Sequence, residues 1–236
     1  FGSSRFRLKA CPPSATRGRG SAFPLGDCMP RAGVRFLGIV AVAGVAWLSR
    51  PVLREMGTVF GRIEVEEPKY EIVRKMSGYE LRRYGPSTAV EVSAEGPEEN
   101  KAFGRLARFI GVFGVPQNAK QQQIAMTAPV VTKEEGGNGM RMQFILPADA
   151  HGNAPVPTEP GVRLAQRPSA VYAVEQFSGS WSVSAAAERA AALARRVQED
   201  GLAVDESSPW EFFRYNPPWT LPLFRRNEVA VPLKGV

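Results

Sequence analysis

Apolar positions in this chain follow two spacings, and these spacings alternate in the same order twice between residues 64 and 236. Alternating apolar and polar positions predict half-buried strands, and Ala89-Val90-Glu91-Val92 is one such stretch. Apolar positions three or four residues apart predict a helix with one buried face, as at Phe103, Leu106, Ile110 and Phe113. Strands, one helix and further strands are therefore expected in each half of this region.

The first half is predicted to contain strands at Tyr70–Lys75, Tyr79–Tyr84, Ser87–Ala94, Ile124–Thr132 and Met140–Leu146. It is also predicted to contain a helix that begins at Pro97 and is ended by Gly111, Gly114 and Pro116. The second half is predicted to contain strands at Val162–Arg167, Ala170–Phe177, Glu211–Tyr215 and Glu228–Leu233, and a helix at Val183–Glu199. Ser182 or Ser184 can cap the second helix. Its buried face is predicted to be Val183, Ala187, Ala190, Leu193 and Val197.

The two halves also resemble each other in residue types. Pro86-Ser-Thr-Ala-Val-Glu-Val92 matches Pro168-Ser-Ala-Val-Tyr-Ala-Val174, and a predicted helix follows each of them. The economical architecture is α+β: a duplicated β-α-β-β unit whose antiparallel strands merge into one curved sheet or barrel with two external helices. We assign this domain to residues 63–236, which are enough to bury a hydrophobic core.

The positive charge of the chain is concentrated before this domain. The net charge is +7, but residues 1–62 hold ten Lys and Arg with only Asp27 and Glu55 as acids. Residues 63–236 hold 20 basic and 21 acidic residues. A basic surface for nucleic acid is therefore not expected on the folded domain.

Cysteine and histidine are almost absent from the domain. Cys11 and Cys28 are the only cysteines, and both lie in the basic segment, so the domain has no thiol for a disulfide, a metal or catalysis. His151 is the only histidine, which excludes a multi-histidine metal site. It lies in the turn-like stretch Asp149-Ala-His-Gly-Asn-Ala-Pro155, so a catalytic histidine is not expected.

The N-terminal segment has the composition of a targeting sequence. Residues 1–33 are rich in Arg, Ser, Gly and Pro, as organelle transit peptides are. Phe1 followed by small and basic residues resembles the plastid-directing leaders of algae with secondary plastids, so a plastid (chloroplast) location is expected. Residues 36–48 are uninterrupted apolar residues, too few for the roughly twenty that span a bilayer. They fit part of a targeting signal, a short or interfacial membrane anchor, or a helix packed on the domain. Residues 1–62 are thus predicted to be a targeting or anchor extension and linker.

A Pro-rich loop near the C-terminus is the most distinctive segment: Tyr215-Asn-Pro-Pro-Trp-Thr-Leu-Pro-Leu-Phe-Arg-Arg226. Its prolines fix the backbone and remove hydrogen-bond donors, so the loop is stiff and cannot be the interior of a sheet. Its aromatic, aliphatic and guanidinium groups could clamp a flat apolar ligand with acidic edges. The alternative, which the loop by itself favours, is a structural connection packed by its own side chains.

Short sequence elements over residues 66–233 together resemble the SOUL haem-binding protein family. They are Tyr79-Glu-Leu-Arg-Arg-Tyr84, Ala102-Phe103 with Leu106 and Phe109-Ile110-Gly111, Ile124-Ala-Met-Thr-Ala-Pro-Val130, Phe144-Ile-Leu-Pro147, Phe177 with Gly179, Tyr215-Asn-Pro-Pro218 and Arg225-Arg-Asn-Glu-Val229. The resemblance implies a distorted β-barrel of repeated β-α-β-β units with two helices, in agreement with the pattern above. The activity it implies is reversible binding of haem or other tetrapyrroles.

The resemblance also implies an apolar ligand groove between the first helix and the final Pro-rich loop. One wall of the groove is then formed by Phe103, Leu106 and Phe109, and the other by Trp219, Leu221, Leu223 and Phe224. Burying the face of a porphyrin gains about 25 cal/mol per Å².

Porphyrin propionates need cations at the rim of such a groove, and guanidinium groups suit carboxylates. The nearest candidates are Arg105, Arg108, Arg225 and Arg226. The structural alternative for the first two is a solvated helix face. For the last two it is an ion pair or hydrogen bonds to loop carbonyls.

The haem iron has no evident protein ligand in this chain. Haem ligands are usually His, Cys, Met or Tyr. One proposed family ligand is a histidine near the start of the domain, and this chain has none there. His151 is only a weak axial candidate. Met76, Met126, Met140 and Met142 are expected to fill core gaps or strand faces. We therefore expect weakly ligated, hydrophobic binding, for which metal-free porphyrins or chlorophyll intermediates are as credible as haem.

Two other functional classes remain open at this point. The first is a structural or interaction subunit of a membrane-associated complex that keeps the fold without binding haem, in contact with a membrane or membrane protein through residues 36–48. The second is an enzyme that acts on a small apolar molecule. Fold alone does not distinguish them. No nucleophile–base pair stands out, so catalysis is not expected, and a tetrapyrrole carrier is the leading hypothesis.

Overall fold

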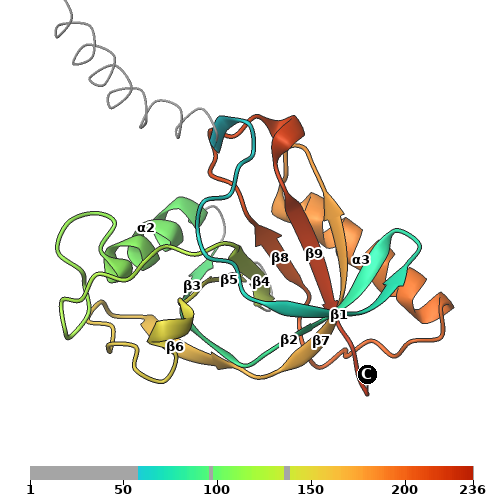
Figure 1. Ribbon diagram of the computed structural model, residues 1–236, viewed down its shortest axis with the longest axis horizontal. Helices are drawn as coiled ribbons and strands as arrows, with labels where there is room; N and C mark the ends of the chain where they lie inside the picture. Colours follow the sequence, from blue (N-terminus) through green and yellow to red (C-terminus); the bar gives the residue numbers. More distant parts are fainter. Residues whose placement is uncertain (1–57, 96–97, 136–138, 236) are drawn as a thin grey trace, which may run out of the picture. The chain divides into compact units, whose positions relative to one another are not determined.

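The computed structural model describes residues 58–95, 98–135 and 139–235 of the chain (Figure 1). The first half of this part contains β1 (Tyr70–Met76), β2 (Tyr79–Tyr84), β3 (Ser87–Glu95), α2 (Glu99–Ile110), β4 (Val130–Glu135) and β5 (Gly139–Ile145). The second half contains the short 3-10 helix η1 (Ala148–Ala150), β6 (Val162–Arg167), β7 (Ala170–Phe177), α3 (Val183–Glu199), β8 (Glu211–Arg214), the 3-10 helix η2 (Pro222–Phe224) and β9 (Asn227–Pro232). The predictions for residues 1–57 lie outside the described residues.

All nine strands form one sheet in the order β1-β2-β7-β9-β8-β4-β5-β3-β6. Every ladder between these strands is antiparallel. The predicted α+β class, an antiparallel sheet with two helices, is therefore confirmed. Within the described residues β1 and β6 are edge strands that no ladder joins, so the predicted closure into a barrel is not confirmed.

The order of the strands agrees with the predicted repetition of a β-α-β-β unit. In the first half β5 lies between β3 and β4, and in the second half β9 lies between β7 and β8. The strand that precedes each unit pairs with the other half, β2 with β7 and β6 with β3. This exchange ties the two halves into a single sheet.

The sheet is strongly curved, because strands far apart in its order come close to each other. β6 is an edge strand and β7 is third from the other edge, yet only Pro168 and Ser169 separate them in the sequence. Arg167 of β6 also reaches Glu211 of β8 at 2.7 Å, past three intervening strands. One face of the sheet is thus turned inward, and we call it the interior face. The helices pack on the opposite face, which we call the helix face.

α2 packs on β3 and β5 of the helix face (Figure 1). Its buried residues are Ala102, Leu106, Ala107, Phe109 and Ile110. The helix ends at the predicted Gly111, whose φ is 89°. A Cβ atom there would lie 2.6 Å from Cγ of Pro116, so the turn needs glycine.

α3 packs on β7 and β9 of the same face and has the predicted bounds. The Ser182 Oγ accepts a hydrogen bond from the Ala185 amide at 3.1 Å, which identifies Ser182 as the cap. The helix buries Ala186, Ala190, Leu193 and Val197. Ala186 is buried in place of the predicted Ala187, because the 3.6-residue period places Ala187 at the side of the buried stripe. The predicted Val183, in the first turn, is only partly buried.

Two other expectations need correction. The strand predicted at Ile124–Thr132 begins only at Val130, directly after Pro129, which has no amide proton to donate to a ladder. Phe113 lies beyond the end of α2 and is exposed, as is Phe103 in part, so the buried stripe runs through Leu106, Phe109 and Ile110 instead. No helix of the described residues is long and apolar enough to cross a membrane.

Candidate functional site

The final Pro-rich loop packs against residues 58–61. The Leu221 amide donates to the Val59 carbonyl at 3.0 Å, and the Asn216 side chain donates to the Gly61 carbonyl at 3.0 Å. Gly61 has a φ of 86°, and a Cβ atom there would lie 2.3 Å from the Phe224 carbonyl oxygen. The close approach of the two segments therefore requires glycine.

This contact leaves a group of large apolar side chains in solvent. We call them the loop corner: Phe60, Trp219, Leu221, Leu223 and Phe224. The rings of Phe60 and Phe224 meet edge to face at 5.7 Å, and the Trp219 side chain is 60% exposed. Leu223 is 75% exposed. Clustered exposed apolar side chains mark surfaces that bind an apolar partner.

The helical wall of the predicted groove is mostly buried in the core. Leu106 and Phe109 are in the cluster between α2 and the sheet, with almost no exposed surface. Phe103 is partly exposed, and its ring packs edge to face on Phe144 at 5.2 Å. No hydrogen bond, ion pair or ring contact within the described residues joins these side chains to the loop corner. Of the three residues of the predicted helical wall, Phe103 therefore keeps exposed surface, whereas Leu106 and Phe109 do not.

The two α2 arginines are engaged by one carboxylate. Glu159, in the loop before β6, accepts from Arg105 at 2.9 Å and from Arg108 at 3.0 Å. Arg105 also donates to the Pro160 carbonyl. Burial raises the pKa of Glu159, but the hydrogen bonds and charges of the two arginines outweigh this and lower it.

The two loop arginines also have structural partners. Arg225 donates through Nε to the Thr220 carbonyl at 2.8 Å and through Nη2 to the Pro218 carbonyl at 2.6 Å, which stiffens the loop. Arg226 pairs with Glu67 at 2.8 Å and Glu228 at 3.0 Å. The structural alternative predicted for Arg225 and Arg226 is therefore present, whereas Arg105 and Arg108 are held by Glu159 instead of forming a solvated helix face. Each guanidinium group has five N–H donors and can hold a further acceptor.

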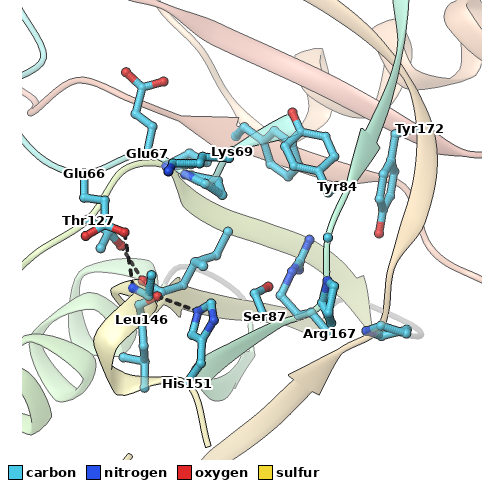
Figure 2. Close-up of a pocket in the computed structure, with 18 residues that line it drawn as sticks. Glu66, Glu67, Lys69, Tyr84, Ser87, Thr127, Leu146, His151, Arg167 and Tyr172 are labelled. Carbon is cyan, nitrogen blue, oxygen red and sulfur yellow. Dashed lines mark hydrogen bonds between the residues drawn. The ribbon is translucent and has the colours of Figure 1, made fainter. Parts of the chain in front are cut away.

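A cavity of about 260 Å³ lies on the interior face (Figure 2). Six strands each contribute one residue to it: Tyr84, Ser87, Ile145, Arg167, Tyr172 and Phe213. The Tyr84 ring packs edge to face on Tyr172 at 5.9 Å and on Phe213 at 6.1 Å. The cavity is the space on the interior face of the curved sheet that these rings do not fill.

A buried group of charges borders this cavity. Glu211 of β8 pairs with Arg167 at 2.7 Å and with Lys133 at 2.7 Å, and it accepts from the Tyr172 hydroxyl at 3.0 Å. Arg167 also donates to Gln143 at 2.7 Å. Burial raises the pKa of Glu211, but the charges of Arg167 and Lys133 outweigh burial and lower it.

A second buried group is centred on Glu228, which has no exposed surface. It accepts from Arg82 at 2.9 Å, from Arg226 at 3.0 Å and from the Tyr215 hydroxyl at 3.0 Å. Burial and the Glu228 charge raise the pKa of Tyr215, and they raise that of Tyr84 to about 12. Both hydroxyls therefore stay protonated at neutral pH, and that of Tyr215 is a donor to Glu228.

The family of the chain follows from its match to known sequences. The sequence profile described as "SOUL heme-binding protein" matches residues 65–232. This chain belongs to the SOUL family. Human "Heme-binding protein 2" is 31% identical over 157 residues, which cover 64% of this chain and 76% of that protein. Mouse "Heme-binding protein 2" is 26% identical over 171 residues, 66% of this chain and 82% of that protein.

Similarity to solved structures is weaker. The crystal structure of the EcmrR C-terminal domain is 12% identical to this SOUL chain with a TM-score of 0.49, over 71% of this chain and 99% of that one. A likeness at this level does not bear on function.

The only histidine of this SOUL chain lies at the edge of the cavity and not at the loop corner. Nε2 of His151 is 3.2 Å from the Leu146 carbonyl oxygen, and Figure 2 shows the ring beside Leu146. The described residues hold no cluster of three His, Cys, Asp or Glu side chains that could bind a metal ion.

Sequence reasoning missed the cavity, since its lining comes from six strands and from the segments that connect them. One signal in the sequence could have indicated a polar interior: Glu211 and Glu228 are charged residues within otherwise apolar strand segments. A charge at a position that the strand pattern assigns to the interior needs a buried partner.

Proposed function

We propose that this SOUL protein binds haem or a related tetrapyrrole reversibly and without catalysis, at the loop corner. The observation that supports this is the exposed apolar surface of Trp219, Leu221, Leu223 and Phe224, held by a stiff loop in a member of this family. Matched relatives carry the name heme-binding protein. A flat macrocycle suits such a surface, because burial of its apolar face gains about 25 cal/mol per Å².

Arg225 is the cation best placed for a propionate. It lies within the loop, and its bonds to the Thr220 and Pro218 carbonyls fix the guanidinium group while using two of its five N–H donors. Arg226 is committed to two carboxylates, and Arg105 and Arg108 share Glu159. We therefore assign Arg225 the rim role ahead of the other three arginines.

Iron ligation by this chain is not required for such binding. His151 belongs to the cavity edge, and the loop corner contains no His, Cys, Met or Tyr. Binding that rests on the apolar face accepts a metal-free porphyrin as readily as haem. A replacement His151→Ala is expected to leave the absorbance spectrum of the haem complex unchanged.

The test is a titration of the full chain with haem and with protoporphyrin, followed by absorbance. We expect a saturable shift with both ligands at micromolar concentration, with no turnover of either. Leu223→Ala and Trp219→Ala should weaken binding at least tenfold, a loss of about 1.4 kcal/mol. Phe103→Ala is the matched control, an exposed apolar side chain on the other predicted wall. Equal weakening by Phe103→Ala extends the site to α2, and absence of a shift with either ligand overturns the proposal.

One observation favours a second candidate, an interaction subunit that does not bind haem. All four candidate arginines already have partners, and the exposed loop corner suits a protein surface as well as a macrocycle. This candidate predicts no spectral shift with either tetrapyrrole. It also predicts loss of the partner when Leu223→Ala protein is purified from its native source and compared with the unaltered chain.

We further propose a plastid location, in which residues 1–62 direct the domain and residues 36–48 attach it to a membrane. The support is the basic, acid-poor composition of residues 1–33 and the apolar run that follows. A fluorescent fusion of residues 1–62 should enter plastids. Deletion of residues 36–48 should move the protein from the membrane pellet to the soluble fraction.

A further inference from the structure

The interior cavity is too small for the ligand proposed above. About 260 Å³ holds roughly nine water volumes of about 30 Å³ each. Pockets for drug-sized ligands measure about 300–1,000 Å³, and a tetrapyrrole needs a long flat surface. The cavity fits a molecule the size of one aromatic ring with a short substituent.

The walls of the cavity favour an apolar body. The Tyr84 ring meets the rings of Tyr172 and Phe213 edge to face, and Ile145 also lines the cavity. The hydroxyl of Tyr172 is occupied by Glu211. These walls therefore offer aromatic and aliphatic surface, which takes a flat ring or a branched aliphatic group.

The charges beside the cavity are not balanced. Arg167 and Lys133 both pair with Glu211, so two cations share one carboxylate. The Glu211 side chain is 2% exposed and that of Arg167 is 11% exposed. Among the ion pairs of the described residues, neither cation has a second carboxylate. One positive charge is thus left without compensation in a poorly solvated place, where an anion would be stabilised.

The cavity is also polarised from end to end. Figure 2 shows Arg167 and Ser87 at one end, and Glu66 and Glu67 at the other. The Glu67 charge is offset by Arg226, and Glu66 accepts from the Ala148 amide at 3.2 Å. Lys69 and His151 complete the ionisable lining. A ligand anion is therefore favoured at the Arg167 end.

We propose that this cavity is a second binding site, which takes a small monocarboxylate with a compact aromatic or branched aliphatic body. The carboxylate lies at Arg167, next to the Ser87 hydroxyl. The apolar body lies against the wall formed by the Tyr84, Tyr172 and Phe213 rings. The anion supplies the second negative charge that Arg167 and Lys133 lack, and it does so without any contact to the loop corner.

The test compares three probes of equal shape on the full chain by NMR titration at low ionic strength. We expect benzoate to bind at least tenfold more tightly than the neutral benzamide, and benzylamine not to bind. Equal binding of benzoate and benzamide, preferred binding of benzylamine, or no saturation by benzoate below a Kd of about 1 mM overturns the proposal.

Two variants locate the site. Ser87→Leu places a larger side chain in the cavity and should weaken benzoate at least tenfold while leaving the haem titration unchanged. Lys133→Met leaves Arg167 and Glu211 as a balanced pair, so benzoate should weaken at least fivefold with benzamide unaffected. Lys101→Met is the control, an exposed lysine on α2 whose loss changes the net charge equally. Benzoate affinity unchanged in Ser87→Leu, or lowered equally by Lys101→Met, contradicts the assignment.

Discussion

The helix face and the interior face of the sheet are stabilised by different forces. On the helix face, Leu106, Leu193 and Phe212 are fully buried among other apolar side chains. On the interior face, Glu211 and Glu228 are as deeply buried, each between two cations. Apolar contacts are non-directional, so neighbouring side chains can relax to fill a small change in volume. A buried charge instead depends on specific partners at fixed distances.

This difference explains where the cavity lies. Ion pairs such as Arg167–Glu211 connect distant strands and fix their separation, so the interior cannot contract as an aliphatic core does. The helix face has residues of many sizes that fill its space, from Ala190 to Phe212. The interior face is therefore less closely packed than the helix face, but its charges are held at fixed positions. Charges at fixed positions are what a binding site needs.

Substitution of Glu228 should give the largest effect on the interior face. Glu228→Gln keeps the shape of the side chain but leaves Arg82 and Arg226 without their buried carboxylate, so we expect a loss of about 3–5 kcal/mol in the free energy of unfolding. Glu80→Gln is the control, since Glu80 also pairs with Arg82 at 2.9 Å but is partly exposed. The control should lose less than about 1 kcal/mol by urea denaturation. Equal losses would show that burial of the carboxylate is not what matters.

The helix face should respond to lost volume rather than lost charge. Leu193→Ala removes apolar contacts beneath α3, and we expect a loss of about 2–5 kcal/mol, reduced where neighbours relax into the space. Leu223→Ala makes the same chemical change on the exposed loop corner and should cost less than about 0.5 kcal/mol. Thermal unfolding of both variants measures this. A large effect of Leu223→Ala would mean that the loop corner is part of the core.

The sequence predicted the strands and helices well, because their signals are local. β2, β6, β7 and α3 have the predicted bounds, since alternation and helical spacing are repeated within each element. The start of β4 was missed because Pro129 interrupts an otherwise apolar run. The α2 stripe was misplaced because Phe103 and Phe109 are both apolar, and only packing decides which one is buried.

The candidate site was harder to predict, because its parts come together only in space. Arg226 and Glu67 are far apart in the sequence, yet they form an ion pair. Nothing local shows that residues 58–61 pack against the final loop. The exposed apolar residues of that loop could be predicted from its prolines and aromatics. The cavity could not, because it depends on the curvature of the sheet.

Acid should affect the interior face more than the helix face. The pKa of Glu211 is lowered in the folded state, so its contribution to stability is complete above the unfolded pKa of about 4.3 and is lost as the pH falls through the folded pKa. Urea denaturation from neutral to acidic pH should show this decline. The Glu211→Gln variant lacks the titrating group, so it should be less stable than the unaltered protein at neutral pH. Its free energy of unfolding should also fall less steeply as the pH is lowered. An identical decline in the two proteins would assign the acid effect to other groups.

The smallest predicted effect on the stability of the helix face concerns the N-terminal ends of its helices. The Ser182 Oγ caps α3, whereas α2 has no side-chain cap at Glu98. Ser182→Ala leaves the Ala185 amide unsatisfied, so we expect a loss of about 1 kcal/mol, measured by urea denaturation. Ser184→Ala is the control, because the Ser184 hydroxyl contacts only the Ser182 Oγ among the described hydrogen bonds. It should cost less than about 0.5 kcal/mol. Since α3 lies on the helix face alone, Ser182→Ala should lower stability without changing the affinity of the interior cavity for benzoate. A change in that affinity would show that the two faces are coupled.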